Sequence, residues 1–280
     1  MKRRTFIKSA SGLFLPLAFP AVSSAVQITN KVIHVTTCKV NTLRVPAVSH
    51  AGLNTNLVAY WRMEENNLQL RIDATGNGND LSYDQAVAAS GGGVCANCTG
   101  SAGGTLSLSA SGSGSFFGNI QPGDSFTVQA WLNFVAIPAS GYHGVVSSWD
   151  SSTIAYFVWF QNPNPGKLYY TVSNAAGVQQ TDRLIVTSPA TATWHHLIFG
   201  YDATNTQTFF QWNNGARSTF SCTGIYKSAG TSDFRLMAYG GDNGPPNMTV
   251  DEVGWWRRVL TTDEVTALYG GGSGLCWPFT

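Results

Sequence analysis

Alternating apolar and polar residues dominate the chain from residue 56 onward. In residues 125–134 the apolar side chains fall on every second position, so they face one side of a strand; they are Phe126, Val128, Ala130, Leu132 and Phe134. Turn-forming residues separate further short segments of this kind, which is typical of a two-sheet antiparallel β-sandwich. The other predicted strands are residues 57–63, 105–108, 144–149, 154–160, 167–172, 184–187, 194–201, 208–212, 216–221, 234–238 and 250–259.

One segment near the end of the chain breaks the strand pattern. Thr261 and Glu264 have the spacing of a capping box, in which each side chain satisfies a backbone N–H of the other residue. Val265 and Leu268 then fall on one face of a helix, and Gly270 follows as a C-terminal stop. The sequence therefore predicts one short helix over residues 262–269.

The remaining segments are read as connections. Residues 88–104 contain six glycines and are predicted to be a loop. Asn213-Asn214-Gly215 predicts a hairpin turn, because an Asn-Gly pair accommodates the two positive φ angles of a type I′ turn. Residues 26–55 lack periodicity and are interpreted as a linker or N-terminal extension, which leaves residues 56–280 as one domain.

The first 25 residues are predicted to be a signal peptide. A basic start precedes a short apolar run and a small-residue cleavage site, and Arg3-Arg4 followed by Phe6-Ile7-Lys8 resembles a twin-arginine motif. An ordinary secretory signal is the alternative, and both imply export to the periplasm, the cell surface or the medium of a bacterium. The apolar run is too short to cross a membrane.

The charge of the chain narrows the range of partners. Charged residues make up only 11% of the sequence, and removing the four basic residues of the signal takes the formal charge from +1 to −3. No basic cluster remains in the mature chain, so a nucleic-acid partner is not expected.

Several motifs occur in the order found in laminin G-like domains, and together they span residues 56–280. The chain resembles that family, which has the concanavalin A-like lectin fold, so the resemblance implies a two-sheet jelly roll with one C-terminal helix. It implies little about the ligand. The matching segments are residues 57–61 with Glu65, the turn at 73–79, residues 125–131, Thr193-Trp194-His195-His196 with residues 200–202, Asn214-Gly215, and the final strand with Asp251-Glu252.

The arrangement of carboxylates argues against an enzyme. A glycosidase needs two carboxylates that flank the scissile bond, which on one strand requires acids at i and i+2 or i+4. The Glu-x-Asp-x-x-Glu pattern of laminarinase-like enzymes of this fold is absent. Glu64-Glu65 and Asp251-Glu252 are adjacent pairs, whose side chains point to opposite faces. We therefore expect a non-catalytic module, with a glycoside hydrolase as the less favoured reading.

A structural calcium ion is expected from the resemblance. The turn at residues 73–80 concentrates the oxygen donors that calcium prefers. The family often holds calcium near this turn, which implies Glu65, Asp73, Asn77 and Asp251 as ligands. The alternative is that these side chains only cap their own turn. His195 and His196 are neighbours on a strand, so we expect packed histidines rather than a shared ion.

Five cysteines give several possible pairings. Cys95 and Cys98 lie within the glycine-rich segment at 88–104, and a local disulfide between them is the first expectation in an exported chain. A disulfide between Cys38 and Cys276, near the two ends of the chain, is a second possibility. An odd number leaves at least one thiol free or paired between chains.

The predicted ligand site combines aromatic and amide side chains. Exposed aromatic faces stack on sugars, and the middle strands offer such residues beside hydrogen-bonding groups. We expect a glycan or cell-surface polymer as partner, bound by Trp159, Gln161, Asn162, Trp212 and Asn214. The alternative reading of these aromatics is that they are packed. The alternative function is a structural or adhesive module that binds other proteins, to which residues 26–55 could add a strand.

Overall fold

The computed structural model describes residues 50–66, 70–83, 88–100, 106–108, 124–149, 154–161, 164–225, 233–237 and 246–280. The predicted signal peptide, Cys38 and Asn162 lie outside these residues. The strands are β1 (Leu57–Trp61), β2 (Ser82–Tyr83), β3 (Ala88–Gly91), β4 (Asn97–Gly100), β5 (Leu106–Leu108), β6 (Phe126–Phe134), β7 (His143–Trp149), β8 (Ile154–Phe160), β9 (Lys167–Val172), β10 (Arg183–Thr187), β11 (Trp194–Asp202), β12 (Gln207–Trp212), β13 (Ser218–Ser221), β14 (Asp233–Leu236) and β15 (Met248–Trp256). The helices are η1 (Ala51–Asn54), α1 (Thr262–Tyr269) and η2 (Gly270–Gly272).

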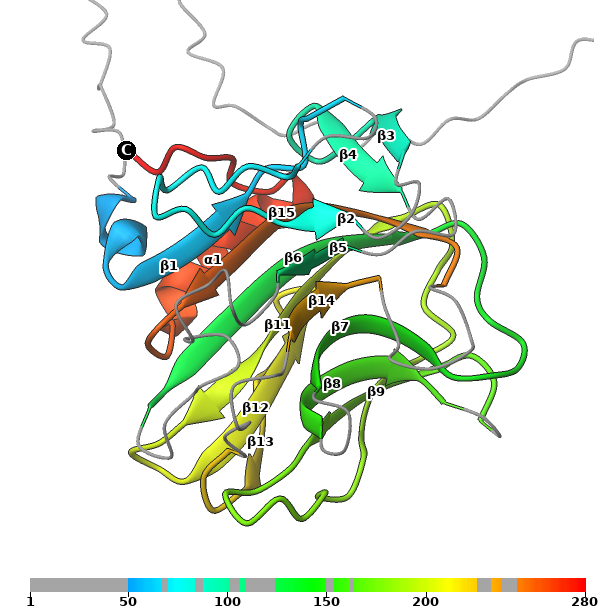
Figure 1. The fold of residues 1–280 in the computed structure, drawn as a ribbon, viewed down its shortest axis with the longest axis vertical. Helices are drawn as coiled ribbons and strands as arrows, with labels where there is room; N and C mark the ends of the chain where they lie inside the picture. Colours follow the sequence, from blue (N-terminus) through cyan, green and yellow to red (C-terminus); the bar gives the residue numbers. More distant parts are fainter. Residues whose placement is uncertain are drawn as a thin grey trace, which may run out of the picture. The chain divides into compact units, whose positions relative to one another are not determined.

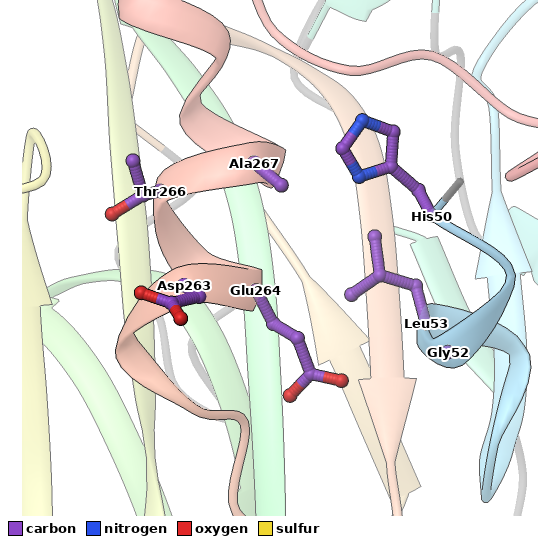
Figure 2. Close-up of a pocket in the computed structure, with 7 residues that line it drawn as sticks. All are labelled: His50, Gly52, Leu53, Asp263, Glu264, Thr266 and Ala267. Atoms are coloured by element: carbon purple, nitrogen blue, oxygen red, sulfur yellow. The ribbon is translucent and has the colours of Figure 1, made fainter. Parts of the chain in front are cut away.

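The strands form two antiparallel sheets, which confirms the predicted sandwich with one short C-terminal helix (Figure 1). The eight-stranded sheet has the order β13-β12-β11-β6-β15-β4-β3, and β1 also pairs with β15. The seven-stranded sheet has the order β10-β9-β8-β7-β14-β5-β2. Their facing sides enclose the main hydrophobic core.

Strand β6 shows how the sequence pattern becomes packing. Its apolar positions, from Phe126 to Phe134, all lie in the core between the sheets. The opposite face of β6 is also buried: Thr127, Gln129 and Trp131 are almost inaccessible to solvent. A second layer therefore covers the eight-stranded sheet.

That second layer consists of η1, α1 and the C-terminal residues. Leu53 from η1, Val265 and Leu268 from α1, and Phe279 pack together over Tyr60 in a second, smaller core. Figure 1 shows the C-terminus beside η1, where the His50 N–H donates a 2.8 Å hydrogen bond to the Thr280 carbonyl. The domain thus includes residues 50–55, which the sequence had assigned to a linker.

The N-terminus of α1 has the predicted capping box. The Glu264 N–H donates to the Thr261 hydroxyl over 3.2 Å, and the Thr261 N–H donates to the Glu264 carboxylate over 2.8 Å. Gly270 follows with φ +56°, the left-handed angle that glycine adopts at little cost.

In the described residues, no helix is long and apolar enough to span a membrane.

Two expected connections need correction. Part of the predicted loop at 88–104 forms the β3–β4 hairpin, where the Gly93 N–H donates to the Ala96 carbonyl over 3.0 Å. A Cβ at Gly93 would overlap the Asn97 carbonyl, so this glycine permits a tight turn rather than a loop. At the β12 end, the positive φ angles belong to Asn213 and Asn214, not to an Asn-Gly pair.

The expected Cys95–Cys98 disulfide is wrong. Cys95 pairs with Cys276, with 5.7 Å between their Cα atoms, and Cys98 and Cys222 are buried outside this disulfide. Cys98 lies within β4, paired with Ser90, and is therefore held in the sheet while Cys95 sits in the turn that faces the C-terminal residues. The bond joins the β3–β4 hairpin to the end of the chain.

Candidate functional site

The outer face of the seven-stranded sheet carries aromatic residues that belong to neither hydrophobic core. On β8, Tyr156, Val158 and Phe160 point into the core between the sheets. Phe157 and Trp159 alternate with them and so face outward. They are nevertheless only 2% and 6% exposed, which identifies a second set of packed aromatic rings on this face.

Trp159 lies at the centre of this aromatic group. Its ring centroid is 5.3 Å from that of Tyr142, with 17° between the planes, and 5.0 Å from that of Phe157, at 26°. In the β-ladders Trp159 lies between Gly144 on β7 and Tyr169 on β9. The group is therefore built from three neighbouring strands and the segment that precedes β7.

A chain of polar side chains adjoins the rings. The Trp159 indole N–H donates to the Thr171 hydroxyl over 3.1 Å, and that hydroxyl donates to Oδ1 of Asp182 over 2.5 Å. The Gln161 amide donates to Oδ2 of Asp182 over 2.7 Å. Both carboxylate oxygens of half-buried Asp182 are thus oriented before any ligand arrives.

This geometry changes the part that Trp159 can play. Its indole is buried and in contact with Tyr142, so it does not present a free ring face as the sequence reading required. Tyr142, Gln161 and Asp182 are partly exposed and form the accessible surface of the group. Of the predicted ligand residues, Trp159 and Gln161 therefore lie in one candidate site. Tyr142, Thr171 and Asp182 belong to the same site and were missed by sequence reasoning.

Trp212 and Asn214 belong to the other sheet. Trp212, at the end of β12, stacks on His195 with a centroid distance of 4.8 Å. Oδ1 of Asn214 accepts hydrogen bonds from Gln211, over 3.3 Å, and from Thr266 of α1, over 3.4 Å. These contacts tie the two residues to the β12 turn and the helix, so the five predicted ligand residues do not form one set.

The two adjacent histidines are packed on opposite faces of β11. His195 contacts the Phe134 and Trp212 rings, and its Nε2 lies 2.9 Å from the Ala190 carbonyl. His196 stacks on Trp131 on the other side, where burial lowers its pKa to about 3. They share no ion site.

The four predicted calcium ligands are engaged in other interactions. Asp73 accepts hydrogen bonds through both carboxylate oxygens from the backbone and side chains of its own turn and of β1. The Ile72 N–H donates to Glu65, and the Asn77 amide donates to the Val58 carbonyl. Asp251 accepts from the β3–β4 turn. In the described part of the chain, no three His, Cys, Asp or Glu side chains are grouped to hold a metal ion, so calcium stays a prediction.

Asp251 and Glu252 form a buried acidic pair on β15. Burial, and then the charge of Glu252, raise the pKa of Asp251 to about 8, and burial raises the pKa of Glu252 to about 7. Oδ2 of Asp251 accepts from the N–H groups of Val94 and Cys95. Glu252 accepts from the Tyr60 hydroxyl over 2.6 Å. Both side chains are fully buried, so a substrate in solution cannot reach them.

Comparison with known proteins identifies the family. A laminin G family model, described as the concanavalin A-like lectin/glucanases superfamily, matches residues 102–266, more than half of the chain. The chain belongs to the concanavalin A-like lectin/glucanases superfamily. No curated protein matches the sequence.

Solved structures of the superfamily fold resemble this chain at low sequence identity. Domain 4 of AbnA, a GH43 extracellular arabinanase from Geobacillus stearothermophilus in complex with arabinotriose, has a TM-score of 0.57 and 15% identity over 79% of this chain and 98% of that chain. The binding domain of Paraclostridial Mosquitocidal Protein 1 has a TM-score of 0.59 and 15% identity over 76% of this chain and 52% of that one. The botulinum neurotoxin serotype G binding domain has a TM-score of 0.58 and 11% identity over 77% and 51%.

These likenesses establish the fold. The chain spans about half the length of the two toxin structures and nearly all of the arabinanase domain. These three structures are described as domains, two of them as binding domains.

Proposed function

We propose that the chain is an exported, non-catalytic, lectin-like module that binds a glycan or a cell-surface polymer through the outer face of its seven-stranded sheet. The observation that carries the proposal is an aromatic group linked through the Thr171 hydroxyl to an oriented carboxylate. Tyr142 supplies the partly exposed ring, which buried Trp159 supports from behind, and Gln161 and Thr171 fix Asp182 beside them.

Saccharide chemistry matches this combination. A sugar ring presents C–H groups on one side, which pack on an aromatic face, and hydroxyl groups around its edge. A carboxylate accepts hydrogen bonds from hydroxyls, and a glutamine amide both donates and accepts. Because Asp182 and Gln161 already hold each other in place over 2.7 Å, little side-chain entropy is lost when a ligand binds.

The similar structures support a binding role. The arabinanase domain was captured with arabinotriose, and the toxin segments are called binding domains. The superfamily also includes glucanases, so a glycoside hydrolase remains the less favoured alternative. Against it stands the burial of Asp251 and Glu252, whose side chains are inaccessible to a substrate in solution.

The proposal also includes export of the chain and one structural calcium ion. The N-terminal residues have the composition of a signal peptide, with Arg3-Arg4 in a twin-arginine-like context. A module that binds a cell-surface polymer would act in the periplasm, at the cell surface or outside a bacterial cell. A structural calcium near Asp73 would add stability rather than ligand contacts.

A structural or adhesive role that binds proteins is the second candidate. One observation favours it: β10 is the edge strand of the seven-stranded sheet, and its Leu184 is 45% exposed. An exposed edge strand can pair with a strand from another chain. Leu184 lies across the ladder from Tyr169, on the same outer face as Trp159, so a protein partner would compete with a glycan there.

A glycan array with the full chain and two variants tests the proposal. We expect a defined set of saccharides to bind, and Asp182→Asn to weaken the best of them by about tenfold, because the amide replaces half of the acceptor capacity. Asp263→Asn, an exposed carboxylate on α1, is the matched control and should bind as the unmodified chain does. A blank array together with concentration-dependent assembly in light scattering would favour the protein-binding role instead.

A further inference from the structure

A groove of about 720 Å³ lies at one end of the eight-stranded sheet, away from every residue assigned above to ligand binding. Four segments that are distant in the sequence line it: the residue before β1, the start of β6, the β11–β12 turn and the segment between β15 and α1. The lining residues are Asn56, Asp124, Ser125, Asp202, Thr204, Asn205, Arg257, Arg258 and Val259. Its size falls in the range of small-ligand sites, roughly 300–1,000 Å³.

Direct hydrogen bonds join the walls of the groove. The Arg257 N–H donates to the Asn56 carbonyl over 2.8 Å, which connects β15 to the residue before β1. The Ala203 N–H donates to the Ser125 hydroxyl over 3.0 Å, which connects the β11–β12 turn to β6. The groove is therefore preformed, and a ligand would not have to bring its walls together.

The charged side chains of the groove are also held in place. Arg257 donates from Nη2 to both oxygens of Asp124, over 3.0 and 3.2 Å, while its side chain stays 52% exposed. Asp202 accepts from the N–H groups of Thr204 and Asn205. Arg258 donates to Glu264 over 2.7 Å from each of two nitrogens. These contacts fix where each donor and acceptor points.

The balance of these groups indicates the class of ligand. The lining includes two carboxylates, Asp124 and Asp202, and two arginines, Arg257 and Arg258, so its formal charges sum to zero and give it no net attraction for an anion or a cation. Val259 is the one aliphatic side chain of the lining, which disfavours an apolar ligand. Hydroxyl groups both donate and accept, so neighbouring hydroxyls of one molecule can bridge a carboxylate and a guanidinium.

We propose that this groove is a second binding site, separate from the outer face of the seven-stranded sheet, and that it binds a neutral saccharide through vicinal hydroxyls that bridge Asp124 and Arg257. Thr204 and Asn205 also line the groove and contribute further hydrogen bonds. The module then has two saccharide contacts, one with an aromatic wall and one without.

Backbone amide NMR of the full chain tests this inference. The probes are neutral trisaccharides (arabinotriose, xylotriose and cellotriose), with trigalacturonate as an acidic counterpart. We expect the amide signals of Ser125, Thr204, Asn205 and Arg257 to shift and saturate with at least one neutral trisaccharide. Arg257→Gln and Asp124→Asn should each weaken that binding about tenfold, and the control Asp263→Asn should not.

The outcomes separate this inference from the proposed function. Shifts at Gln161 and Asp182 that Asp182→Asn abolishes report the outer face of the seven-stranded sheet and say nothing for the groove. No shift of the four groove amides with any neutral trisaccharide at about 10 mM would overturn the inference, because such binding would be weaker than any useful site. Tighter binding of trigalacturonate than of every neutral probe would overturn it as well.

Discussion

The hydroxyl of Tyr60 donates a 2.6 Å hydrogen bond to the carboxylate of Glu252, and both side chains are fully buried. Gln129 donates to the same hydroxyl over 3.0 Å, and the Trp277 N–H donates to Glu252 over 3.4 Å. Glu252 sits in the bulge of β15 with φ +45°, an angle that costs a non-glycine residue about 1–3 kcal/mol. This network connects β1, β6 and β15 to the C-terminal residues.

The buried acids give the fold a pH dependence that Glu252→Gln should reduce. Burial raises the pKa of Glu252 to about 7 and that of Asp251 to about 8. Carboxyl groups of the unfolded chain titrate near 4, so between these values the folded state binds more protons than the unfolded state. The stability from this pair is therefore present at acid pH and is lost as the pH rises from about 4 to about 8.

Glutamine has no proton to lose, so the variant lacks the contribution of Glu252. We expect the free energy of unfolding of Glu252→Gln, relative to the unmodified chain, to rise between about pH 5 and about pH 8 in urea titrations. A difference between the two proteins that stays constant over this range would contradict the assignment of a raised pKa to Glu252.

His196 contributes a pH dependence of the opposite sign. Its imidazole is buried against Trp131, and burial lowers its pKa to about 3. The unfolded histidine takes up a proton near pH 6.5, whereas the folded one does not, so stability is lost as the pH falls from about 6.5 toward about 3. His196→Phe keeps a ring on Trp131 but loses the 3.1 Å contact with Gln129.

We therefore expect His196→Phe to be less stable than the unmodified chain at pH 7, by about 1–2 kcal/mol for the unpaired Gln129 oxygen. The gap should narrow as the pH falls toward about 4, because the phenyl ring binds no proton. Denaturant unfolding at several pH values measures this directly, and a gap that widens at acid pH would refute the explanation.

Local sequence patterns were sufficient to predict much of the fold. Strands β8 and β9 and helix α1 have the predicted limits, because their alternation and capping signals involve residues close in the sequence. The burial of Gln129 and Thr127 was not predictable in this way. This burial depends on α1 and the C-terminal residues, which cover that face of β6. The sequence of residues 273–280 has no periodicity from which their packing could be predicted.

The candidate site was predictable only in part, for the same reason. Trp159 and Gln161 stand out because an aromatic and an amide lie two positions apart where β8 ends. Asp182 reaches them only through the pairing of β8 with β9 and the course of the chain toward β10, so no local pattern marks it. The Cys95–Cys276 bond spans 181 residues, and the nearer Cys98 was the more obvious partner on spacing alone.

Asp73→Asn should lower stability whether or not calcium binds. Oδ1 of Asp73 accepts from the Tyr60 N–H and from the N–H and hydroxyl of Thr75, and Oδ2 accepts from the N–H and amide of Asn79. An asparagine amide would face some of these donors with its own N–H groups. We expect the free energy of unfolding to fall by about 2–3 kcal/mol, measured by urea unfolding in the presence of a chelator.

The calcium expectation is tested by the same pair of proteins. A melting temperature of the unmodified chain that rises with calcium, and no rise in Asp73→Asn, would support an ion held by Asp73. An equal response of both proteins, or none, would leave Asp73 as the cap of its own turn and remove calcium from the account of this site.

The Cys95–Cys276 disulfide joins two segments that pack against the buried Asp251 and Glu252. On one side of the bond, the N–H groups of Val94 and Cys95 donate to Asp251 over 2.7 and 3.2 Å. On the other side, Trp277 donates to Glu252 and stacks on Tyr60 with a centroid distance of 5.4 Å. Reducing the disulfide removes the covalent restraint on both segments.

Replacing both cysteines with serine should lower the free energy of unfolding by about 2–5 kcal/mol and speed amide exchange in residues 274–280. Reductant should bring the unmodified chain to the level of the double variant and leave that variant unchanged. Cys98→Ala is the control, because Cys98 is not part of the disulfide and its replacement leaves the Cys95–Cys276 bond in place. If Cys98→Ala instead matched the double variant and lost its response to reductant, Cys95 would be paired with Cys98 in solution, and the C-terminal residues would be held by packing alone.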